Sequence, residues 1–103
     1  MSKFFLFEAG GHDLYFMSIN KFKKDADHEQ INKVIPVHRK WAKLQLASGT
    51  PVQAGEWGER GGMSIIRAES MAEAEVVVNQ DPLVQAGLIT FETAQLHPAI
   101  PFI

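Results

Sequence analysis

The sequence predicts an α+β fold of the ferredoxin-like type, in the order strand, helix, strand, strand, helix, strand. Three observations predict it. β-Forming residues concentrate in four short segments, proline or a capping residue marks the start of helical segments, and a glycine-rich turn joins two central strands. With 103 residues the chain has room for one core, so we expect a single domain over residues 1–103.

The N-terminal segments are predicted from their composition. Residues 1–13 are interpreted as an arm or an extra edge strand, and residues 14–22 as the first strand, because aromatic and β-branched residues are frequent there. The polar residues 23–32 are expected to hold at most one helical turn. Lys21, Lys23 and Lys24 are interpreted as a solvated basic run rather than a phosphate-binding patch.

The first helix is expected to begin at Pro36, because proline is tolerated in the first turn and costs about 3 kcal/mol inside a helix. Gly49 is a suitable terminator. Val37, Trp41 and Leu44 follow a helical spacing and are therefore predicted to form the buried stripe.

The second half of the chain is expected to hold a hairpin, two helices and a final strand. Residues 51–57 and 63–68 read as strands joined by the glycine-rich turn 58–62, which no helix follows and which is therefore a poor candidate for a phosphate loop. Ser70 and Glu73 have the spacing of a capping box, and Ala72 and Val76 are expected on one side of the helix that follows.

A short second helix begins at Asp81-Pro82 and stops at Gly87. Residues 88–96 are the expected last strand, which His97-Pro98 ends.

This topology leaves one face of the sheet uncovered by helices, and a second copy of the chain is the simplest cover. We therefore expect a dimeric α/β-barrel. Phe16 and Ser18 on the first strand and Thr90 on the last belong to strand faces that carry both apolar and polar side chains. Such faces suit a cavity between two sheets better than a dry interface. With Trp57 at its rim, these residues are the predicted substrate-binding wall.

The composition excludes several classes of protein. The chain has no cysteine, which rules out disulfides and thiolate chemistry, and its net charge of −2 gives no basic footprint for nucleic acid. No apolar stretch is long enough to span a bilayer, so we expect a cytoplasmic protein without a membrane partner. No residue spacing matches a standard metal site, and no cofactor is expected.

Two residues are candidates for chemistry. His38 would lie in the first turn of a helix that begins at Pro36, where the positive helix end disfavours a second proton on the imidazole. A neutral imidazole can act as a general base. Asp81 has a sufficient structural explanation as a helix cap, and it can at the same time orient a histidine. Spacing leaves open whether the two helix starts meet.

Several segments resemble the YCII (YciI-like) family. They are Pro36-Val37-His38, Gly61-Gly62-Met63-Ser64-Ile65-Ile66, Ala68-Glu69-Ser70-Met71-Ala72-Glu73-Ala74 and, most specifically, Asp81-Pro82-Leu83-Val84-Gln85-Ala86-Gly87-Leu88. The resemblance implies a homodimeric barrel and an active site whose histidine and aspartate are His38 and Asp81. Relatives resemble muconolactone isomerases, and one branch removes chloride from a chlorinated hydroxyquinol.

Two hypotheses follow. The first is a cofactor-independent lyase or isomerase, including dehydrochlorinase-like chemistry, that acts on a small aromatic or lactone-type molecule with His38 and Asp81 as its catalytic pair. The alternative is a non-catalytic module with the same barrel, which binds a small ligand or docks onto an enzyme. A short distance between the His38 ring and the Asp81 carboxylate would favour the first.

Overall fold

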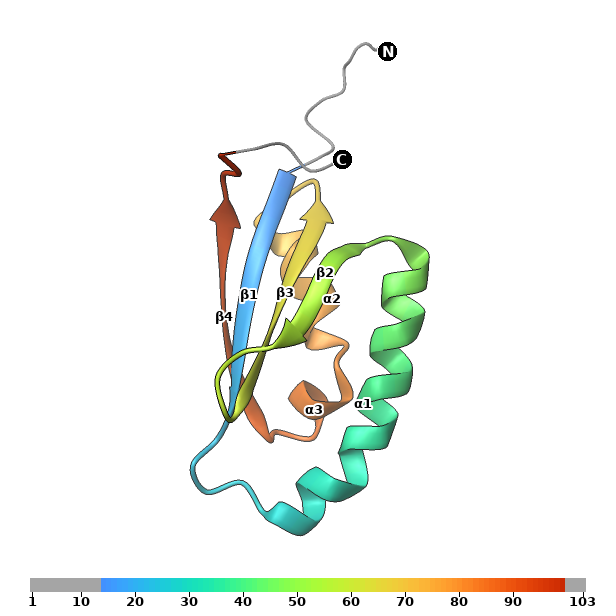
Figure 1. Cartoon of the computed structure of the whole chain (residues 1–103), viewed down its shortest axis with the longest axis vertical. Coiled ribbons are helices and arrows are strands. Elements are labelled where there is room, and N and C mark those ends of the chain that lie inside the picture. Colours follow the sequence, from blue (N-terminus) through green and yellow to red (C-terminus); the bar gives the residue numbers. More distant parts are fainter. Residues whose placement is uncertain (1–13, 100–103) are drawn as a thin grey trace.

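The computed structural model describes residues 14–99, so the expected N-terminal arm lies outside the described residues. The elements are β1 (Leu14–Phe22), α1 (His28–Ser48), β2 (Pro51–Glu56), β3 (Gly61–Ala68), α2 (Met71–Asn79), α3 (Pro82–Gln85) and β4 (Ile89–Leu96). The four strands form one antiparallel sheet in the order β2-β3-β1-β4 (Figure 1). This order confirms the predicted ferredoxin-like fold class.

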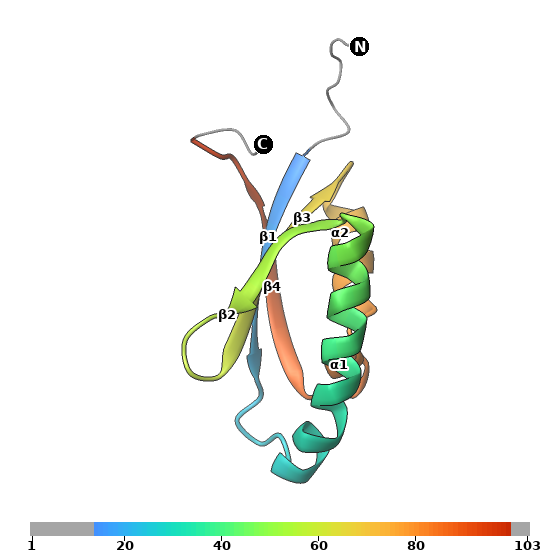
Figure 2. The same ribbon diagram turned by 45° about the vertical axis from the view of Figure 1, so that its right-hand side comes forward.

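The helices of residues 14–99 lie to one side of the sheet, as Figure 2 shows, and no element of this described part covers the other face, which we call the open face. Two apolar clusters hold the helices to the sheet. One packs α2 onto the centre of the sheet through Phe16, Ile66 and Ala74. The other joins the start of α1 to α3 through Ile31 and Leu83.

The first helix begins at His28, so the predicted start at Pro36 was wrong. Asp27 caps the helix by accepting a hydrogen bond from the Glu29 amide at 3.2 Å, and Ile31 is buried in its first turns. Pro36 lies inside the helix. Capping and the burial of Ile31 therefore outweigh the cost of an interior proline, which removes one backbone hydrogen bond.

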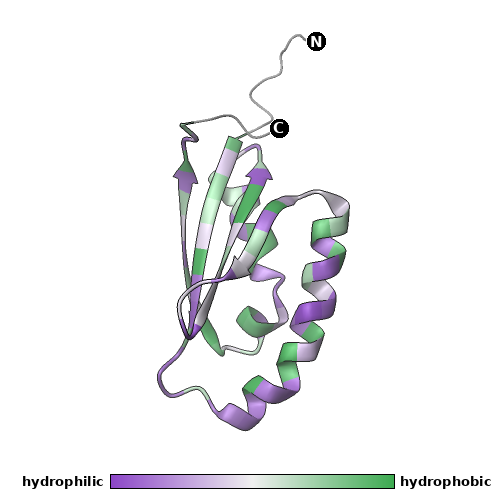
Figure 3. Cartoon of the chain, in the orientation of Figure 1, coloured by the Kyte–Doolittle hydropathy of each residue, from purple (hydrophilic) through white to green (hydrophobic). Residues whose placement is uncertain are grey.

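The buried stripe of α1 also differs from the prediction. Val37 and Leu44 are 56% and 62% exposed, whereas Ile31, Val34 and Ile35 pack into the core. Figure 3 shows apolar and polar residues alternating along α1. Both sets of residues satisfy the helical period, so the period alone cannot decide which set faces the core.

The second helix begins where its capping residues predict. The Ser70 hydroxyl accepts from the Glu73 amide at 3.1 Å, and the Glu73 carboxylate accepts from the Glu69 amide at 3.0 Å, one residue before the cap. Its buried residues are Ala74 and Val78, whereas the predicted Val76 is 57% exposed.

The register of the sheet corrects the predicted wall of the cavity. Phe16 and Ser18 are 2% and 1% exposed and lie beneath the helices. Thr90 pairs with Lys21, which points to the same side of β1 as Met17 and Ile19, so Thr90 lies on the open face. Phe16 and Ser18 thus lie on the opposite face from Thr90. The helices cover the face that carries Phe16 and Ser18, and they leave the more uniformly apolar face of β1 uncovered.

Candidate functional site

His38 and Asp81 meet in the helix layer. The Nδ1 atom of His38 lies 2.7 Å from the Oδ1 atom of Asp81, although the residues are 43 positions apart in the sequence. His38 belongs to the stripe of α1 that faces the other helices, and Asp81 is the residue before α3. The contact between α1 and α3 therefore builds the pair.

Asp81 has two partners on one oxygen atom. Its Oδ1 accepts the hydrogen bond from His38 and a second one of 2.9 Å from the backbone amide of Leu83. Asp81 is only 5% exposed, and Leu83 beside it is in the core. Capping and pairing are thus simultaneous, and the cap holds the carboxylate in place for the histidine.

His38 lies about three turns inside α1, because the helix begins at His28. The expectation that free amides at a helix start act on its ring is therefore wrong, since these amides lie in the first turn. Instead, its neighbours are the Asp81 carboxylate and the Trp41 ring, whose centroid is 6.2 Å away at an interplanar angle of 37°. The His38 side chain is 29% exposed, which leaves part of it open to solvent.

The hydrogen bond to Asp81 determines which ring nitrogen can act as a base. An ionised carboxylate only accepts hydrogen bonds, so a neutral His38 donates its proton from Nδ1. The Nε2 atom then carries the free lone pair. Within residues 14–99, no other group forms a hydrogen bond with the His38 ring. This arrangement suits proton abstraction by Nε2.

A row of hydroxyl groups crosses the helix-facing side of the sheet. Ser18 on β1 pairs in register with Ser64 on β3 and with Thr93 on β4. The Ser18 hydroxyl accepts a hydrogen bond of 3.1 Å from the Thr93 hydroxyl. Of these three residues, the sequence analysis predicted only Ser18 as a site residue. Ser64 and Thr93 can be placed beside it only when the register of the strands is known.

The other predicted wall residues lie elsewhere. Trp57 is 49% exposed and continues β2 beside the hairpin turn, and Thr90 is exposed on the open face. Phe16 is a core residue packed against α2. The structure thus brings His38 and Asp81 together, and it does not gather the four predicted wall residues around them.

Trp41 is the neighbour of His38 that sequence reasoning assigned to the core alone. It follows His38 by three residues, which is a spacing that brings side chains together on a helix. Among residues 14–99 no cluster of three or more histidine, aspartate or glutamate side chains is placed to hold a metal ion. No helix of the described part is both long and apolar enough to cross a membrane.

The fold and the site define a ferredoxin-like α+β domain with a buried aspartate paired to a histidine. The chain belongs to the YCII-related family, because the model of the YCII-related domain matches residues 14–93. No curated protein matches it in sequence.

A solved structure supports the same fold. It is 5-chloro-2-hydroxyhydroquinone dehydrochlorinase from Burkholderia phenoliruptrix AC1100, in complex with 2,5-dihydroxybenzoquinone. The alignment has a TM-score of 0.65 and 20% identity, and it covers 81% of this chain and 93% of the dehydrochlorinase chain.

Proposed function

We propose that this chain catalyses proton transfer on a small molecule, with His38 as general base and acid and Asp81 as the residue that orients it. The observation that carries the proposal is the 2.7 Å contact between His38 Nδ1 and Asp81 Oδ1. A histidine whose tautomer is set by a fixed carboxylate is an arrangement that acid–base catalysis uses repeatedly. The chemistry requires no cofactor.

The reaction begins when His38 Nε2 removes a proton from a carbon next to a carbonyl group, as in a lactone or in the keto tautomer of a phenol. The Asp81 carboxylate stabilises the imidazolium that forms, and its own position is held by the Leu83 amide. In a lyase, the electron pair then expels a leaving group such as chloride. In an isomerase, the same proton returns from Nε2 to another carbon of the substrate.

The proposed substrate class is a small aromatic or lactone-type molecule. Support comes from membership of the YCII-related family and from the similar fold of a dehydrochlorinase that acts on 5-chloro-2-hydroxyhydroquinone. That compound and unsaturated lactones are therefore the first members of a substrate panel. Release of chloride distinguishes the lyase reaction from isomerisation.

The test is turnover of this panel by matched histidine variants. We expect His38→Ala to lower kcat by at least about a hundredfold, which is the usual contribution of a positioned acid–base group. His28→Ala is the control, because His28 is exposed at the start of the same helix. If His38→Ala turns over substrate at the rate of the unmodified chain, the assignment is wrong.

We further propose that a second copy covers the open face of the sheet, forming a homodimeric barrel. Met17, Ile19, Met63 and Ile65 are neighbours on this face, and all four are only partly buried by the chain itself. An apolar sheet face of this kind commonly marks an interface between proteins.

A further inference from the structure

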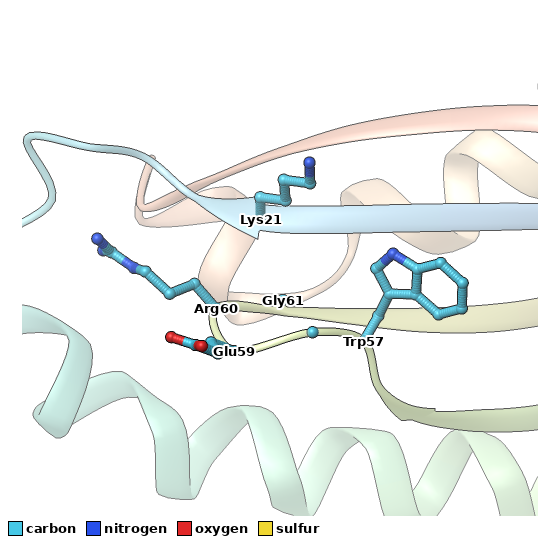
Figure 4. Close-up of a pocket in the computed structure, with 6 residues that line it drawn as sticks. Lys21, Trp57, Glu59, Arg60 and Gly61 are labelled. Atoms are coloured by element: carbon cyan, nitrogen blue, oxygen red, sulfur yellow. The ribbon is translucent and has the colours of Figure 1, made fainter.

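A hollow opens beside the hairpin that joins β2 and β3 (Figure 4), and neither His38 nor Asp81 is among its lining residues. Its volume is about 320 Å³, near the lower end for small-molecule sites. The lining consists of Lys21, Trp57, Gly58, Glu59, Arg60 and Gly61. By register, Lys21 and Gly61 pair at the hairpin end of the open face, beyond the Ile19–Met63 pair that the proposed second copy covers, whereas the His38–Asp81 pair lies in the helix layer.

The backbone of the hairpin keeps this hollow open. Gly58 has a φ of 66°, a conformation that favours glycine, and a Cβ atom at Gly61 would collide with the carbonyl oxygen of Asn20. Two lining positions therefore carry no side chain. The Trp57 amide donates to the Gly61 carbonyl at 3.0 Å, and the Phe22 amide donates to the Arg60 carbonyl at 3.0 Å. These two hydrogen bonds hold the hairpin backbone that carries the hollow.

Two side chains give the hollow its chemistry. The Trp57 indole is 49% exposed and offers an aromatic surface. Lys21 is exposed, and no carboxylate within residues 14–99 pairs with its ammonium group. In Figure 4 the Lys21 side chain extends from β1 and the Trp57 side chain from the start of the hairpin turn, whereas the Glu59 carboxylate and the Arg60 guanidinium point away from the indole.

We propose that this hollow is a second small-molecule site, which binds a planar aromatic carboxylate. The ring of the ligand stacks on Trp57, and its carboxylate accepts a hydrogen bond from the Lys21 ammonium group. Stacking on indole favours flat rings, and a charge-assisted hydrogen bond favours an anion. Because the hollow is open, the dissociation constant of a simple ligand should be on the order of millimolar.

The experiment titrates benzoate into the ¹⁵N-labelled chain and follows the two indole N–H resonances. The resonance that disappears in Trp57→Leu belongs to Trp57, and the other belongs to Trp41 beside His38. We expect a saturable shift of the Trp57 resonance. A shift confined to Trp41 would move the ligand to the helix side and overturn the proposal, as would no saturable shift at all.

Substitutions and ligand analogues test each contact. Lys21→Gln should weaken benzoate binding about fivefold, whereas Lys24→Gln, which removes an equal charge from an exposed position outside the lining, should change it less than twofold. Benzyl alcohol tests the anion, and cyclohexanecarboxylate tests the flat ring. Equal weakening by both substitutions, or an analogue that binds as tightly as benzoate, would overturn the proposed contacts. Sedimentation of each variant confirms an unchanged assembly.

Discussion

Asp81 shows how one carboxylate can cap a helix and hold a histidine side chain at the same time. A single oxygen atom accepts hydrogen bonds from the Leu83 amide and from the His38 ring. Capping alone explains the Asp-Pro sequence, so the sequence could not separate the two roles. The pair itself could not be derived from spacing, because it depends on how α1 docks against α3.

Asp81→Asn separates these roles experimentally. Asparagine caps helices about as well as aspartate, so the free energy of unfolding should fall by about 1 kcal/mol or less. The neutral amide stabilises an imidazolium poorly, and kcat should fall at least about tenfold. Chemical denaturation and turnover are measured on the same samples. If turnover falls only in proportion to the folded fraction, Asp81 is a cap without a role in catalysis.

At the scale of the element, α1 presents Ile31 to the core and Val37 to solvent. Ile31→Ala removes buried methyl groups beside Leu83 and should cost about 2 to 4 kcal/mol of unfolding free energy. Val37→Ala, at an exposed position on the same helix, should cost less than about 0.5 kcal/mol. Urea denaturation of both variants tests which stripe is buried. If Val37→Ala lowers the unfolding free energy more than Ile31→Ala does, the stripe predicted from the sequence is the buried one.

The strands were easier to predict than the helices. Residues 14–22 alternate and end at turn signals, and β1 has these bounds in the structure. The start of α1 was misplaced because proline is costly inside a helix, and Pro36 was therefore taken as the helix start. The residues that stabilise the first turns, the cap Asp27 and the buried Ile31, precede the proline. Helix propensity describes the cost of an interior proline correctly, but it does not include the stabilisation that comes from tertiary packing.

The choice of sheet face was also beyond the sequence. Both faces of β1 carry apolar residues, with Phe16 on one and Met17 and Ile19 on the other. The helices cover the face with Phe16 and Ser18, and the buried Ser18 is satisfied there by Thr93. A buried hydroxyl is tolerated when it has a hydrogen-bond partner on a neighbouring strand, which only the register reveals.

At the scale of the whole molecule, the open face determines the predicted assembly. Ile65 lies near its centre, between Met17 on β1 and Gln53 on β2. If a second sheet covers this face, Ile65→Lys places an unpaired charge in the interface and should raise the dimer dissociation constant at least about a hundredfold. Sedimentation velocity over a range of concentrations measures this constant.

The control for this prediction is Val76→Lys, which places the same charge at a 57% exposed position on the helix side. It should leave the assembly unchanged, because α2 lies on the opposite side of the sheet (Figure 2). If water rather than a second copy covers the open face, Ile65→Lys should leave the assembly unchanged, since lysine on a wet sheet face is well tolerated. A lysine variant that sediments like the unmodified chain would therefore show that the open face is not the interface.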